Sequence, residues 1–130
     1  MSLGSDNPDA SATAIGYARA STVEQAVSGY LLQDQHEKIR DYCRARSWDL
    51  VRVYADEGAS GADSARNGFS EARAVLLSGD ARALVVTKLD RLSRSASLML
   101  AVTEELEAAG VGIVSITDAP LTWRSQPGMV

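Results

Sequence analysis

Two arginine-bearing motifs contain the residues best suited to chemistry in this chain. The first, residues 17–21 (YARAS), places Arg19 two positions before Ser21 at the end of an apolar run, and the second, residues 90–94 (DRLSR), holds Arg91 and Arg94. Arginine presents rigid, forked donors that match phosphate oxygens, and it keeps its charge near neutral pH. A hydroxyl beside several arginines therefore suits a phosphodiester substrate, and the polymer that carries phosphodiesters is nucleic acid.

Arg19 and Ser21 are expected to face the same substrate group, because residues two apart on an extended strand project to the same side. A serine hydroxyl that attacks phosphorus needs its target held in line and the added negative charge of the transition state neutralised. The alternative is that Ser21 is a turn or helix-cap serine, which is common after a strand.

The second motif is predicted to open a long helix whose charges are reversed. Arg91 and Arg94 would lie on one face of its first turn, with Lys88 just before them, while the glutamates lie toward its far end. Cations at a helix N-terminus cost roughly 0.3 to 1 kcal/mol each unless an anion joins them. This pattern predicts a phosphate-sized anion site. The alternative is that Asp90 is an N-cap and the arginines form a solvated face.

A loop of about a dozen residues is predicted between Asp56 and Gly68, where glycine, serine and aspartate are frequent. It contributes Arg66, which taken alone is more often a surface residue than a ligand. Asp56 could orient an arginine or cap a turn. The length of the loop suggests a function beyond simple connection.

Other chemistries are disfavoured by the residues that the chain lacks. The single histidine, His36, falls in the middle of a predicted helix, so a Ser-His-acid triad is not expected. The chain has no His/Cys cluster for zinc, no glycine-lysine phosphate loop and no Gly-x-Gly-x-x-Gly after a strand. Acidic pairs for magnesium are also not apparent. Serine and arginine remain, and no cofactor is expected.

The apolar pattern predicts an α/β fold with a mostly parallel sheet of four or five strands flanked by helices. Strands are predicted over residues 14–18, 50–54, 83–87 and 111–116. Helices are predicted from about residue 31 to 46, over 69–77 up to Gly79, and from 90 to 109 up to Gly110. Residues 19–21 and 88–91 would then follow strand ends, where ligands of such sheets bind.

Size and composition fit one domain, predicted over residues 14–130 after a disordered tail at residues 1–13. The chain has 130 residues, of which 45% are hydrophobic. Cys43 is interpreted as a small core residue and not as a reactive thiol. With no membrane-length apolar run and no secretory signal, the expected location is the cytoplasm. The net charge of −4 has the wrong sign for a free-standing DNA-binding module, so either another segment supplies affinity or the partner is not nucleic acid.

The chain resembles the catalytic domain of the serine recombinases, the group of resolvases, invertases and large serine integrases, from Ala14 to about Asp118. Each of the motifs that carry this resemblance is weak alone, but their order and spacing are specific. They are residues 17–21 (YARAS), 32–35 (LQDQ), 56–61 (DEGASG) with 66–68 (RNG), and 88–94 (KLDRLSR).

The resemblance implies a resolvase-like fold and a site-specific DNA recombinase in which Ser21 attacks the scissile phosphate to form a 5′-phosphoserine link. It implies that the phosphate is bound by Arg19, Arg66, Arg91 and Arg94. Asp90 is expected to position arginines or assist proton transfer. The expected supporting or phosphate-binding positions are Tyr17, Gln35, Asp56 and Lys88.

The resemblance also implies the partners. They are double-stranded DNA, bound through a C-terminal region absent from this chain, and further copies of the protein, which form a homodimer that assembles to a tetramer. Neither metal nor nucleotide is implied, and no membrane. Two alternatives are a non-catalytic α/β phosphate-binding regulatory domain and a serine phosphoesterase for small substrates. The second is disfavoured because no group is evident that would activate water to release a phosphoserine.

Overall fold

Strands and helices alternate along the chain, as the apolar pattern predicts. The structure, a computed structural model, describes residues 12–21, 31–58, 67–92 and 95–117. In chain order the elements are β1 (Thr13–Ser21), α3 (Leu31–Ala45), β2 (Asp49–Gly58), α4 (Asn67–Ser78), β3 (Ala83–Val86), the 3-10 turn η3 (Leu89–Arg91), α5 (Ala96–Ala108) and β4 (Gly112–Ser115).

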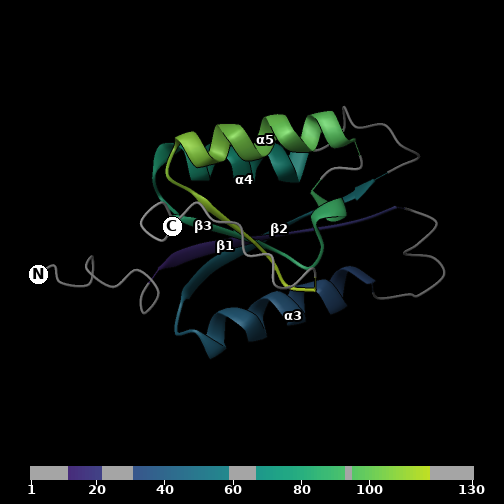
Figure 1. Ribbon diagram of the computed structural model, residues 1–130. Coiled ribbons are helices and arrows are strands. Elements are labelled where there is room, and N and C mark those ends of the chain that lie inside the picture. Colours follow the sequence, from purple (N-terminus) through teal and green to yellow (C-terminus); the bar gives the residue numbers. More distant parts are fainter. Residues whose placement is uncertain (1–11, 22–30, 59–66, 93–94, 118–130) are drawn as a thin grey trace, which may run out of the picture.

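The described strands form one parallel sheet in the order β2-β1-β3-β4, which confirms the predicted sheet with four strands. Helix α3 covers one face of the sheet, and α4 and α5 cover the other (Figure 1). The chain runs outward from β1 to β2 and then returns past β1 to β3. The strand order therefore reverses between β1 and β3, and ligands of such sheets bind at this reversal, beyond the carboxyl ends of the strands.

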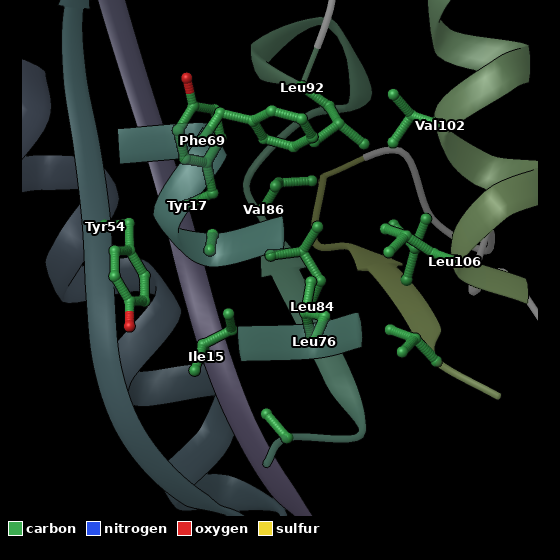
Figure 2. Packing of buried hydrophobic residues seen from close by; sticks show 14 residues of the cluster. Ile15, Tyr17, Tyr54, Phe69, Leu76, Leu84, Val86, Leu92, Val102 and Leu106 are labelled. Atoms are coloured by element: carbon green, nitrogen blue, oxygen red, sulfur yellow. The ribbon is translucent and has the colours of Figure 1, made fainter. Parts of the chain in front are cut away.

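Two hydrophobic clusters lie on the two faces of the sheet, and alternate residues of the central strands feed each of them. Ile15 and Leu84 belong to the cluster under α4 and α5, which Figure 2 shows, whereas Ala14 and Val85 belong to the cluster under α3. Strand β3 is buried along its whole length, as its continuous apolar sequence predicts. The cluster under α4 and α5 also takes in Leu92, which directly follows η3 and is fully buried.

The N-terminus of α4 lies directly on β2, and Asp56 holds it there. The Asp56 carboxylate accepts hydrogen bonds from the main-chain N–H groups of Gly68 (2.7 Å) and Phe69 (2.9 Å). These groups have no partner within the helix, so Asp56 caps α4 from a neighbouring strand. A Cβ atom on Gly68 would lie 2.5 Å from the carbonyl oxygen of Ala55, so only glycine permits this approach.

Several predicted boundaries are wrong by a few residues. The predicted loop from Asp56 to Gly68 is shorter, because residues 56–58 belong to β2 and residues 67 and 68 begin α4. What remains of it, residues 59–66, lies outside the described residues, as does the predicted tail apart from Ala12 and Thr13, of which Thr13 begins β1. Strand formation continues past the apolar run in both β1 and β2 because each has the other as a partner there.

The predicted helix stops at Gly79 and Gly110 are confirmed. Gly79 and Gly110 follow α4 and α5 with φ of 91° and 82°, which glycine adopts without strain. In α5, Val102 and Leu106 are buried, whereas Leu98 is 40% exposed. None of the described helices is long and apolar enough to cross a membrane.

We expect Gly68→Ala to destabilise the fold by about 1 to 3 kcal/mol, because the added methyl group meets the main chain of β2, which cannot yield without moving the strand. Chemical denaturation followed by circular dichroism measures the change. Ser70→Ala, an exposed position on the same helix, is the control and should stay within about 0.5 kcal/mol of the parent. Equal stability of the two variants would contradict the close approach.

The Cys43 thiol should react slowly with alkylating reagents. Cys43 is buried in the cluster under α3, as predicted, and burial raises its thiol pKa to about 11, although Arg46 acts in the opposite direction. The thiolate is the reactive form. At about pH 8 we therefore expect labelling by iodoacetamide to be slower than that of a free thiol by roughly two orders of magnitude. Intact-mass measurement checks this, with the denatured chain as the control; rapid labelling of the folded chain would contradict it.

Candidate active site at the ends of β1 and β3

Strands β1 and β3 separate before β1 ends. Their pairing runs from Ala14 with Ala83 to Gly16 with Val85, whereas β1 pairs with β2 as far as Ser21 with Gly58. The last residues of β1 therefore extend beyond β3 on that side. The turn η3, which follows β3, lies next to this extension, at the reversal of strand order.

Arg19 joins the end of β1 to η3 through its side chain. Its guanidinium donates from Nε to the carbonyl oxygen of Arg91 (3.0 Å) and from Nη2 to the carbonyl oxygen of Asp90 (2.8 Å). In return, Nη1 of Arg91 donates to the carbonyl oxygen of Arg19 (3.1 Å). Hydrogen bonds from charged donors contribute roughly 1.5 to 3 kcal/mol each. The two arginines thus fix each other's main chain, and Arg19 is buried in doing so.

The predicted long helix beginning near Asp90 is wrong. Residues 89–91 form the short turn η3, and α5 begins only at Ala96, where the Ser95 side chain caps it by accepting from the Leu98 N–H (3.2 Å). The Leu92 N–H bonds to the Leu89 carbonyl, which closes the turn, and the carbonyls of residues 90 and 91 accept from the Arg19 side chain.

The surroundings of Arg91 differ from those of a helix N-terminus. Arg91 does not lie in the first turn of a long helix, so helix-dipole repulsion does not describe its surroundings. The N-cap position of η3, Lys88, is exposed and makes no side-chain capping bond. Arg19 and Arg91 lie close together because the end of β1 is hydrogen-bonded to η3.

Gln35 reaches the same place from α3. Its side chain is buried, accepts a hydrogen bond from the Arg19 N–H and donates one to the Arg19 carbonyl oxygen, both at 3.1 Å. The sequence places Gln35 on the apolar face of its helix, and this position brings the side-chain amide to the carboxyl end of β1.

Tyr17 and Asp56 are also buried and lie next to Arg19: Tyr17 is two positions before it in β1, and Asp56 pairs with it from β2. The Tyr17 hydroxyl donates to the Asp56 carboxylate (2.8 Å), and its ring packs edge-on against Phe69, with the ring centroids 5.4 Å apart. Figure 2 shows Phe69 between Tyr17 and Leu92. These contacts connect β1, β2 and the start of α4 beneath the site.

Of the residues singled out from sequence, the structure brings a hydroxyl and two arginines to one sheet edge. Ser21, half-buried, ends β1 and lies two positions after Arg19, on the same side of the strand by its alternation. Arg91 and the exposed Asp90 belong to η3, and Asp90 contacts Arg19 through its main chain. Arg66 and Arg94 lie outside the described residues.

Two residues that shape this edge were not assigned these roles from sequence. Leu92 anchors η3 in the core, and its apolar side chain between the polar residues Arg91 and Ser93 was the available signal. Gly68 permits the docking of α4, and only its place next to Asn67 pointed to a special backbone position. Among the residues that the structure describes, no group of three His, Cys, Asp or Glu side chains could hold a metal ion.

Comparisons with known proteins agree on one family. The family model "Resolvase, N terminal domain" matches residues 14–128. A probable DNA-invertase of Sinorhizobium fredii is 37% identical over 95% of this chain and 36% of its own length, and the DNA-invertase of Escherichia phage P1 is 35% identical over 81% and 49%. The chain thus spans about half the length of these curated relatives, or less.

The fold also matches solved structures. A resolvase family site-specific recombinase from Streptococcus pneumoniae superimposes with a TM-score of 0.71 and 25% identity, covering 82% of this chain and 73% of that one. The order of elements, the residues at the sheet edge and the extent of the family match therefore lead to one conclusion: this chain belongs to the resolvase family of serine recombinases and carries their N-terminal domain.

Proposed function

We propose that this chain is the catalytic domain of a site-specific DNA recombinase, with Ser21 as the nucleophile. The observation that carries the proposal is that Ser21, Arg19 and Arg91 come to one sheet edge, at the reversal of strand order, in a chain of this family. A hydroxyl next to guanidinium groups is the chemistry that cleavage of a phosphodiester requires.

The proposed reaction keeps the free energy of the DNA linkage in a protein ester. Ser21 Oγ attacks the scissile phosphorus, a P–Oγ bond forms, and the bond from phosphorus to the 3′ oxygen breaks. The serine proton passes to solvent, and the 3′ oxygen takes up a proton to become a hydroxyl. After strand exchange, the new 3′-hydroxyl attacks the phosphoserine, which restores Ser21. No metal or nucleotide takes part in this scheme.

The arginines have separate proposed roles. Arg91 contacts the phosphate, together with Arg66 and Arg94, because forked guanidinium donors match its oxygens. Arg19 also neutralises charge there, but two of its donors hold η3. Asp90 positions arginines, and Lys88 binds phosphate. Tyr17, Gln35 and Asp56 support the main chain beneath.

The proposed partners are duplex DNA and other copies of the protein. The domain carries a net charge of −4, so the release of counterions from DNA gives it little affinity of its own. We propose that a DNA-binding region outside this chain supplies affinity, that two DNA-bound dimers form the active tetramer, and that the reaction takes place in the cytoplasm.

The first test is the covalent adduct. We expect the protein that carries this chain to be recovered from its host, under denaturing conditions, attached to DNA that sequencing maps to one site. Ser21→Ala should abolish this adduct completely because it removes the attacking oxygen. Ser70→Ala, an exposed serine on α4, should keep it. Adduct in the Ser21→Ala variant would exclude Ser21 as the nucleophile, and its absence from the unaltered protein would favour a non-catalytic phosphate-binding domain.

Arg91 should matter for cleavage more than for folding. We expect Arg91→Ala to lower the rate of adduct formation by roughly 10² to 10³, because one preorganised donor to the phosphate is lost. Its stability should fall by no more than about 1.5 to 3 kcal/mol, for the lost bond from the charged guanidinium to the Arg19 carbonyl. Arg82→Ala, an exposed arginine just before β3, is the matched control and should keep the parent rate. Global unfolding of the Arg91→Ala variant would point instead to a structural role.

A further inference from the structure

We infer that Gln35 is a positioning residue for the proposed cleavage: its side-chain amide takes the place of a neighbouring strand beside Arg19 and so sets the position of Arg19 and of η3. The part that concerns cleavage rests on the proposed function. The structural part, the substitution of a strand by a side chain, stands on the contacts alone.

The main-chain groups of β1 alternate in direction along the strand. In a parallel sheet, successive residues of a central strand direct their N–H and C=O groups alternately toward the two neighbouring strands. The Ala12 carbonyl accepts from Asp49 N–H at the start of β2 (2.9 Å), and the Thr13 carbonyl accepts from Arg82 N–H just before β3 (2.8 Å). Odd-numbered residues of β1 therefore face β3, and Arg19 is one of them.

Strand β3 does not extend as far as Arg19. The pairing of β1 with β3 ends at Gly16 with Val85, and β3 itself ends at Val86. The Arg19 N–H and C=O therefore point toward a place that no residue of β3 reaches. Gln35 lies there, with its Oε1 accepting from the N–H and its Nε2 donating to the C=O.

The two hydrogen bonds between the Gln35 side chain and the Arg19 main chain need an amide. One acceptor and one donor on the same planar group reproduce what a peptide of an adjacent strand would offer. Gln35 is 3% exposed and Arg19 is 9% exposed, so water is a poor substitute for either bond. A carboxylate lacks the donor, and a thioether lacks both groups.

The hydrogen bonds of Gln35 act on the same residue that holds η3 in place. The Arg19 carbonyl that Gln35 binds is also the acceptor for Arg91 Nη1, and the Arg19 side chain holds the carbonyls of Asp90 and Arg91. A shift of the Arg19 main chain therefore moves the guanidiniums of both arginines relative to Ser21. Gln35, from α3 on one face of the sheet, thereby positions a turn that packs with α4 on the other face.

Hydrogen exchange followed by NMR on this chain tests the structural part. In Gln35→Met we expect the main-chain amide proton of Arg19 and its side-chain Nε proton to exchange at least roughly tenfold faster, because both hydrogen bonds from Gln35 to the Arg19 main chain are lost. The amide of Ile15, which faces β3 directly, should change little. Gln33→Met, the same substitution at an exposed position of α3, is the matched control. Unchanged exchange at Arg19, or an equal increase at Ile15, would overturn the inference.

A second variant separates the two hydrogen bonds and covers the case in which Gln35→Met does not fold. Gln35→Glu keeps the shape and the acceptor but loses the donor. We expect the Arg19 amide proton to stay protected, while the carbonyl carbon of Arg19 shifts toward the value of a carbonyl with one bond fewer. An unchanged carbonyl signal would show that the donor of Gln35 has no part in holding Arg19.

The functional part is tested with the covalent adduct. Gln35→Met should lower adduct yield at least roughly tenfold, and Gln33→Met should not. Faster exchange at Arg19 in Gln35→Met together with a full adduct yield would overturn the positioning role. If the unaltered protein gives no adduct, the proposed recombinase activity fails, whereas the exchange experiment still decides whether Gln35 replaces a strand.

Discussion

The site depends on one constraint: β1 runs on past the end of β3, and its main chain must be satisfied there by something other than a strand. Side chains from two sides supply the bonds, Gln35 from α3 and Arg91 from η3. An edge left open would bind water or another chain, and neither would hold an arginine in a fixed direction. Here the part of β1 beyond β3 is the place where the side chains of Arg19 and Arg91 lie together.

A second constraint acts through the carboxylate of Asp56, whose residue pairs with Arg19 across β1 and β2. Asp56 is buried, and its charge is stabilised by the N–H groups at the start of α4 and by the Tyr17 hydroxyl. It therefore joins two strands and a helix at a single residue. The helix N-terminus and β1 are thus positioned by the same buried group.

The sequence sufficed for the type and order of the elements, because alternating apolar runs and glycine stops are local signals. It also placed Arg19 and Ser21 on one side of a strand, since that follows from alternation. It failed where a distant partner decides. The carbonyls of Asp90 and Arg91 accept from Arg19, more than 70 residues away, and this contact cannot be read from the residues around Asp90. The cap role of Asp56 likewise depends on Gly68, whose lack of a side chain mattered only once β2 was known to be its neighbour.

The contact between Asp56 and Gly68 has a consequence for how such a chain can diversify. Because these two residues are hydrogen-bonded, the end of β2 and the start of α4, on either side of the eight positions between Gly58 and Asn67, are held close together. Lengthening a closed segment of this kind costs only about 0.6 kcal/mol for each doubling of its length. Insertions between Gly58 and Asn67 are therefore expected to leave the sheet and α4 in place.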